Sequence, residues 1–419
     1  GAVNSEAETL KKKLEEIIEQ APNENEQWDF KQEWHHSNGE LLRDILNFVN
    51  TPSHDDCYII FGVNDKDGSI IGINDDRYKK DKQQLQDFLR KQPFSQNYYP
   101  KTNVESFDFD GKKVDVLTIY NTNAVPLFLT KDVARLNNED GKRIGKPLQR
   151  GLIYSRINDS NTPVDESTTD DRMQELWQKR FRLDVSVYER AKFVLKDYDN
   201  WTYIKLIAND RKYIYTKDPD FVVEIVDDDM ADSKDQFAAF SLDQDRTKIY
   251  WNKVKLNFRD TTIYENYYLY LNSTDFGTVV PDRYTISLPN LVDDGIAFYY
   301  YFYRNDFPIL ISKLIDHISH VYRFSSEFSS AKFDADVIIF ENKEERKNIE
   351  KKTKDYIYDN FDKMKKWLYP STEDIKTMEH KVQLDIDMSD FKRNRYQIPL
   401  LMFDNKLVQL MQQFKIMMK

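Results

Sequence analysis

Cysteine is almost absent from this chain of 419 residues, in which Cys57 is the single example. One thiol excludes an intrachain disulfide and any zinc site built from several cysteines. Because Cys57 lies inside an apolar run, we expect it to be buried. Scarce cysteine is typical of a reducing compartment, so the sequence predicts a cytoplasmic protein.

Long apolar runs and an excess of positive charge are missing as well. No stretch approaches the roughly 20 apolar residues that span a bilayer, so no membrane insertion is expected. The net charge of −11 argues against nucleic-acid binding through the overall field. Contact with RNA or DNA would therefore need a local basic patch. A content of 40% hydrophobic and 14% aromatic residues nevertheless indicates a folded chain, long enough for two or three domains.

An acidic segment near the N-terminus leads into the first expected strand, residues 27–34. Side chains alternate along a strand, which predicts that Asp29 and Lys31 share one polar face. The same alternation puts Trp34 on the opposite, apolar face together with Trp28. The two adjacent histidines that follow are expected in a solvated loop.

A second expected strand, residues 57–63, is apolar on both faces and ends beside Asp65. This pattern favours a central strand that is covered on both sides. Carboxylates at neighbouring strand ends can meet, so Glu24, Asp29 and Asp65 are candidate oxygen ligands for Mg²⁺ or Mn²⁺. Lys31 would then stabilise charge on a phosphate. Acidic residues are also common at strand ends without any metal, and spacing alone leaves that interpretation open.

These residues resemble the signature of the Schlafen AlbA-type domain. The similarity lies in Glu24-x4-Asp29-Phe30-Lys31, in Asn47-Phe48-Val49-Asn50-Thr51, and in Phe61-Gly62-Val63-Asn64-Asp65 with the glycine-containing turn after it. Two later pieces, Tyr154-Ser155-Arg156 and Asn161-Thr162-Pro163, follow in the order of the family. The resemblance covers roughly residues 20–165 and implies a mixed α/β domain there.

The resemblance also implies an activity. In Schlafen ribonucleases the matching acidic residues form a divalent-metal site, which gives catalytic and metal-binding roles to Glu24, Asp29 and Asp65, with Lys31 beside them. The implied function is a Schlafen-type endoribonuclease that uses Mg²⁺ or Mn²⁺ and acts on tRNA or other structured RNA, in toxin or antiviral defence. Asp29 stands where the family usually has Glu, and Asn64 where it usually has Asp. Two alternatives therefore stay open: a nucleic-acid-binding regulator without catalysis, and a DNA endonuclease.

Basic residues gather in one later loop, at Lys142, Arg143, Lys146 and Arg150, with no acidic residue among them. Such a loop can hold a phosphate backbone without reading its sequence. Arg156, in the second half of the resemblance, is a further candidate for contact with nucleic acid. An ordinary solvated loop explains the four cations equally well.

The expected fold class is α+β. Residues 1–183 are expected to form the Schlafen AlbA-like domain, residues 184–304 a β-rich region dense in aromatics, and residues 305–419 a mainly helical region that could form one unit with the preceding one. Expected helices include residues 5–20, 39–50, 81–91, 168–182 and 342–368, and expected strands include 102–109, 113–120 and 126–130. The acidic loop at 227–235 is expected away from any nucleic-acid track, and His317-x-x-His320 is expected to be structural.

The chain shows one copy of the first motif, whereas animal Schlafens pair two related lobes around RNA. The resemblance therefore implies a homodimer, in which a second subunit supplies the other lobe. No family is recognised for residues 185–419, and we expect that half to bind a trigger or partner protein.

Overall fold

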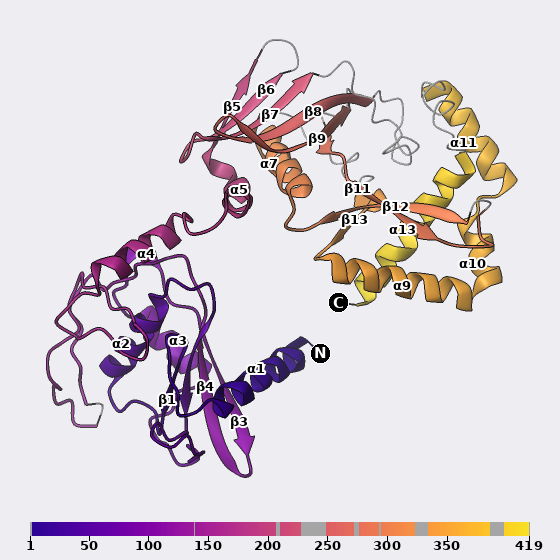
Figure 1. Cartoon of the computed structure of the whole chain (residues 1–419). Helices are drawn as coiled ribbons and strands as arrows, with labels where there is room; N and C mark the ends of the chain where they lie inside the picture. Colours follow the sequence, from indigo (N-terminus) through magenta and orange to yellow (C-terminus); the bar gives the residue numbers. More distant parts are fainter. Residues whose placement is uncertain are drawn as a thin grey trace. The chain divides into compact units, whose positions relative to one another are not determined.

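The computed structural model describes residues 2–137, 139–206, 210–227, 249–271, 276–292, 295–322, 334–385 and 398–418. The chain divides into two compact units, Gly1–Ser186 (unit 1) and Val187–Lys419 (unit 2). Both combine helices with β-sheet, so the fold class is α+β, as predicted (Figure 1). None of the helices in the described ranges is long and apolar enough to span a bilayer.

Unit 1 is built on a four-stranded sheet with the order β1-β2-β4-β3. Its strands are β1 (Trp28–Lys31), β2 (Cys57–Phe61), β3 (Thr102–Phe109) and β4 (Lys112–Ile119). β1 runs parallel to β2, with Asp29 opposite Ile59, and β4 runs antiparallel to both β2 and β3. Asp110 and Gly111 both have positive φ and turn β3 into β4, as the Asp-Gly dipeptide predicts.

Helices cover both faces of this sheet. α1 (Ala2–Glu19) shares a core cluster with Phe30 on one face. α2 (Asn38–Val49) and α3 (Lys82–Arg90) pack on the other face. Because strand side chains alternate, Asp29 points away from the α1 face and toward α2. The polar face predicted for this strand is therefore the face that α2 covers.

Two buried polar side chains join the segments around the end of α2. Asn50 donates from Nδ2 to the carbonyls of Leu127 and Tyr154, both at 2.8 Å. Lys179, on α4 (Asp170–Arg180), donates from Nζ to two backbone carbonyls of the turn after α2, at 2.9 and 2.6 Å. These bonds satisfy backbone carbonyls that lie outside the helices and strands.

Unit 2 begins with α5 (Val187–Lys196) and η2 (Tyr198–Asn200) and continues into a six-stranded antiparallel sheet with the order β10-β9-β8-β7-β6-β5. The strands are β5 (Trp201–Lys205), β6 (Arg211–Tyr215), β7 (Phe221–Asp227), β8 (Ile249–Phe258), β9 (Thr261–Leu271) and β10 (Gly277–Val279). α7 (Phe307–Tyr322) packs into the same core, where Tyr213, Phe221 and Tyr268 are buried. Many of the aromatics in the β-rich region therefore serve as sheet core.

A second, three-stranded sheet completes unit 2, with the order β11-β12-β13. It contains β11 (Asp282–Ser287), β12 (Ile296–Tyr303) and β13 (Val337–Phe340). The remaining helices are α9 (Lys343–Asp359), α10 (Phe361–Leu368), α11 (Thr372–Asp385) and α13 (Ile398–Met417). Residues of α9, α10 and α13 share one buried cluster with this sheet.

Two expected elements differ from the structure, and a third lies outside the described residues. The single helix expected over residues 342–368 is two helices, because Asn360 has φ −125° and ψ 42° and interrupts the helical backbone. The strand expected at 126–130 is reduced to one bridge, between Leu129 and Phe94. The acidic loop lies beyond Asp227, outside the described residues.

The first strand is also shorter than expected, and this moves one aromatic side chain. β1 ends at Lys31, so the alternation does not extend to Trp34. Trp34 instead stacks on Phe61, with ring centroids 4.0 Å apart, in the core on the α2 side. Its Nε1 donates to Asp115 Oδ2 at 2.8 Å. The predicted position of Trp34 on the Trp28 face is therefore wrong.

One buried carboxyl should make the stability of unit 2 depend on pH. Asp404, on α13, is 5% exposed, and its Oδ1 accepts a hydrogen bond from the Phe298 N–H of β12 at 3.0 Å. Burial raises the pKa of Asp404 to about 8, against the smaller lowering effects of that hydrogen bond and of Arg283. The folded state therefore keeps a proton that the unfolded chain loses near pH 4.

We expect the free energy of unfolding of unit 2 to fall as pH rises from about 4 to about 8, by at most about 1.4 kcal/mol per pH unit. Asp404→Asn should remove this decline, because the amide keeps the acceptor oxygen and does not ionise. Hydrogen exchange of β12 peptides between pH 5 and pH 8, corrected for the intrinsic exchange rate, measures it. Asp355→Asn, at an exposed acid of α9, is the control. An unchanged pH slope in Asp404→Asn would contradict the assignment.

Candidate functional site

A turn before β1 brings two carboxylates of the predicted site together. Asn25 Oδ1 accepts hydrogen bonds from two backbone N–H groups that follow it, at 2.8 and 3.1 Å, which bends the chain. Glu24 is consequently hydrogen-bonded to Asp29 through its side chain. On a straight strand these residues, five positions apart, would point to opposite faces.

The contact with Asp29 changes the protonation of Glu24. Burial, the hydrogen bond to Asp29 and the charge of Asp29 together raise the pKa of Glu24 to about 8. The Phe30 N–H and Arg156 act in the opposite direction with smaller effect. Glu24 therefore keeps its proton near neutral pH, because burial and the neighbouring Asp29 disfavour a second negative charge there. A cation placed between Glu24 and Asp29 would take over the role of that proton.

Lys31 is the positive group beside this pair. Its Nζ lies 3.2 Å from Asp29 Oδ2 and 3.6 Å from Asp44 Oδ2, and its side chain is 35% exposed. Burial alone would lower the pKa of Lys31, but the charges of Asp44 and Asp29 outweigh it and raise the pKa. Lys31 therefore stays charged and reaches solvent, as a residue that meets a phosphate must.

Asp44, on α2, was not among the predicted site residues. Its carboxylate contacts Lys31 and helps to fix the position of that amine. It accepts hydrogen bonds from His35 Nε2 at 2.5 Å and from Asn161 Nδ2 at 2.7 Å. Burial tends to raise the pKa of Asp44, but His35 and Lys31 outweigh it and keep the pKa well below its usual range. In the sequence, Asp44 stands three residues after Leu41, on the otherwise apolar face of the helix. An acidic residue on that face could have marked Asp44 as a candidate site residue. The side chain of His35 is 8% exposed, so its expected place in a solvated loop is wrong.

Arg156 lies beneath the carboxylates and is 4% exposed. Its Nε donates to the Asn25 carbonyl at 2.8 Å, and its Nη2 lies 3.6 Å from Glu24 Oε2 and 3.7 Å from Asp29 Oδ1. Arg172 donates to the Arg156 carbonyl at 2.6 Å and fixes its backbone. The guanidinium is buried and is not exposed to a nucleic-acid backbone in this structure, so the contact role expected for Arg156 stays a prediction. Its position is that of a counter-charge for the two acids.

Asp65, the third predicted ligand, stands apart in an exposed turn. Its Oδ1 accepts a hydrogen bond from Gln32 Nε2 at 3.1 Å. The side chain of Asn64 caps this turn by accepting the Lys66 N–H at 2.8 Å. Across the described part of the chain, no three His, Cys, Asp or Glu side chains are placed together to hold a metal ion. The structure thus joins Glu24 to Asp29 and does not gather all three acids.

The basic loop projects from unit 1 as an irregular hairpin, bridged between Val133 and Leu148. All four of its predicted cations are exposed: Lys142, Arg143, Lys146 and Arg150. Lys146 Nζ pairs with Asp165 Oδ2 at 2.7 Å. Among the residues that the structure describes, the other three have no ion pair.

The fold and this charged cluster define the class of protein. Unit 1 is an α+β domain with a carboxylate pair and a lysine at an edge strand of its sheet. Residues 24–165 match the model of the family Schlafen, AlbA_2. The chain therefore carries a Schlafen AlbA_2 domain in unit 1, and this family includes proteins that act on nucleic acid.

Two further comparisons do not assign a function to the chain. No curated protein matches the chain. Among solved structures, it is similar to the DIP2311 protein from Corynebacterium diphtheriae, with 19% identity and a TM-score of 0.24. That match covers 40% of this chain and 30% of the other, and so slight a likeness supports no argument.

The buried position of Arg156 predicts a large effect on stability. Arg156→Met should destabilise unit 1 by about 3 kcal/mol, because Glu24 and Asp29 would lose a buried counter-charge. Proteolysis in a urea series, with the fragments of unit 1 identified by mass, measures the shift. Arg150→Met, at an exposed arginine, should change stability by no more than about 0.5 kcal/mol. Equal effects of the two variants would show that Arg156 does not support the site.

Proposed function

We propose that unit 1 is a divalent-metal-dependent nuclease of Schlafen type that cleaves RNA, with structured RNA such as tRNA as its substrate. The observation that carries the proposal is the Glu24–Asp29 pair beside the charged amine of Lys31. The basic loop of the same unit supplies cations for a phosphate backbone. The family match to Schlafen, AlbA_2 supports an action on nucleic acid.

The donor set fits a hard divalent cation. Mg²⁺ is usually held by one or two protein carboxylates, with water and substrate phosphates completing its shell. Glu24 and Asp29 offer such a pair, and the proton that Glu24 keeps marks a position where positive charge is favoured. When bound, the ion would act as a Lewis acid on the phosphate and lower the pKa of a coordinated water.

The remaining residues of the site fix the positions of the charged groups and neutralise their charge. Lys31 is placed to stabilise negative charge that develops on a phosphate next to the carboxylates. Asp44 holds the amine of Lys31 at 3.6 Å and is itself held by His35 and Asn161. Arg156 compensates the two acids from the protein interior and leaves their outer side to the substrate.

A second function has one specific observation in its favour. Asp65 stands apart, and no three-ligand metal group is found in the described residues. The domain could therefore bind nucleic acid without cutting it, with the charges of the site balanced within the protein. Metal-dependent cleavage separates the two functions.

The first test is cleavage of labelled tRNA, with single- and double-stranded DNA in parallel, in Mn²⁺, Mg²⁺ or EDTA. We expect cleavage of tRNA that EDTA abolishes. Glu24→Gln and Asp29→Asn should each reduce the rate by about a hundredfold or more, since each removes an anionic ligand while keeping its shape. Glu33→Gln, at an exposed acid of the same segment, is the matched control.

Cleavage that persists in EDTA or in both variants would refute the metal site. Preferred cleavage of DNA would show that the substrate is DNA and not RNA. The proposed metal-dependent chemistry would be unchanged. Binding of tRNA with no cleavage in any metal would favour the second function. Asp65→Asn tests separately whether the exposed acid contributes once substrate is present.

The basic loop generates a further prediction. Lys142→Gln and Arg143→Gln should weaken tRNA binding at low salt and reduce the slope of log K against log salt by about one each, because each releases about one counterion fewer. Fluorescence anisotropy over a salt series measures the slope. Lys131→Gln, at an exposed lysine outside the loop, is the control. An unchanged slope in both variants would remove the loop from the binding surface.

A further inference from the structure

A second concave site lies at the other edge of the unit 1 sheet, away from β1. It is a cavity of about 490 Å³ between α3, the short helix η1 (Ser95–Asn97) and the beginning of β3. This volume lies in the range of small-ligand sites. None of its lining residues belongs to the carboxylate site or to the basic loop.

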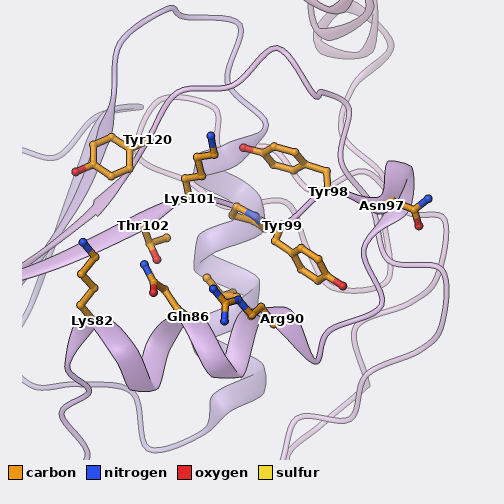
Figure 2. A pocket seen from close by; sticks show the side chains of 11 residues that line it. Lys82, Gln86, Arg90, Asn97, Tyr98, Tyr99, Lys101, Thr102 and Tyr120 are labelled. Atoms are coloured by element: carbon orange, nitrogen blue, oxygen red, sulfur yellow. The ribbon is translucent and has the colours of Figure 1, made fainter.

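The cavity is positively charged. Its lining includes Lys82 and Arg90 from α3 and Lys101 from the segment before β3, and no acidic residue. Figure 2 shows Lys82, Gln86 and Arg90 extending from one helix, as their spacing of four residues requires. Within the described ranges, no ion pair occupies these three cations. In a protein of net charge −11, such a concentration of unpaired positive charge favours an anionic ligand.

The cavity is also aromatic. Tyr98, Tyr99 and Tyr120 line it, and Tyr99 and Tyr120 are 48% and 41% exposed (Figure 2). Tyr99 meets Phe94 edge-on, with ring planes at 85° and centroids 6.3 Å apart, which holds the orientation of its ring. An exposed ring held in place offers a face on which a nucleobase can stack.

The charge around the cavity also limits where an anion can sit. Tyr120 lines a neighbouring hollow together with Glu6, Asp56 and Glu105. These acids would repel a phosphate close to Tyr120. The phosphate position is therefore at the cations nearer to Tyr99 (Figure 2), and the stacking position is at Tyr99 itself.

We propose that this cavity binds a nucleotide, with its base on Tyr99 and its phosphate on Arg90 and Lys101, whereas Lys82 adds positive charge at the far end of the lining. The nucleotide is either an unpaired residue of a nucleic-acid strand or a free mononucleotide, since both present the same ring and phosphate. This site is separate from the Glu24–Asp29 pair, and the inference does not depend on cleavage activity.

Calorimetry on the full chain, in EDTA and at low salt, tests the proposal. The probes are AMP, adenosine, inorganic pyrophosphate and a short oligoadenylate. We expect AMP or the oligoadenylate to bind, and adenosine and pyrophosphate to bind at least about tenfold more weakly, because each lacks the ring or the phosphate. Binding by AMP identifies a free nucleotide, and binding by the oligoadenylate alone identifies a strand.

Variants assign the binding to this cavity. Tyr99→Leu and Arg90→Gln should each weaken it by about tenfold, whereas Tyr99→Phe should preserve it because the ring remains. Lys91→Gln, at the next residue outside the cavity lining, is the matched control for charge. Absent binding of both AMP and oligoadenylate, or equal loss in Lys91→Gln and Arg90→Gln, would overturn the proposal.

Discussion

Buried charge must be balanced where it lies, and this constraint shapes unit 1. The side of β1 that faces α2 carries Asp29, 7% exposed, and Asp44 of α2 packs against it at 8%. Two carboxylates in such a place are costly unless cations or a proton compensate them. Lys31 and Arg156 supply the cations, and Glu24 takes the proton. Several segments of the domain meet at this point because each contributes a charge that the others require.

The same constraint explains why the site is open on one side only. Arg156 sits in the interior and neutralises the pair from beneath, whereas Lys31, at 35% exposed, remains within reach of a phosphate. The exposed side of the site therefore presents a fixed arrangement of charge. An arrangement organised before binding loses little energy to rearrangement when charge develops on the substrate.

The two edges of the unit 1 sheet provide different chemistry. The β1 edge carries paired acids, and the β3 edge carries cations beside exposed tyrosine rings. The sheet order β1-β2-β4-β3 keeps these surfaces apart, with two central strands between them. One small domain can thus keep an acidic surface and a basic surface without either charge cancelling the other.

The sequence by itself determined what depends on neighbours in the chain. The alternation of side chains put Asp29 and Lys31 on one face, the Asp110–Gly111 dipeptide set a hairpin, and apolar periodicity predicted most helices of unit 1. It also contained the family signature over residues 24–165. These features follow from the two-residue period of strands, from the period of three to four residues in helices, and from local turn chemistry. All three can be read directly from the sequence.

Only the tertiary structure decided which distant residues meet. It brought Arg156 next to Glu24, left Asp65 hydrogen-bonded to Gln32 in an exposed turn, and buried His35 against Asp44. It also joined Lys82 and Arg90 of α3 to Tyr99 in one cavity. The reason is physical: strand ends, turns and the balance of buried charge depend on contacts between segments far apart in the chain. No period in the sequence records those contacts.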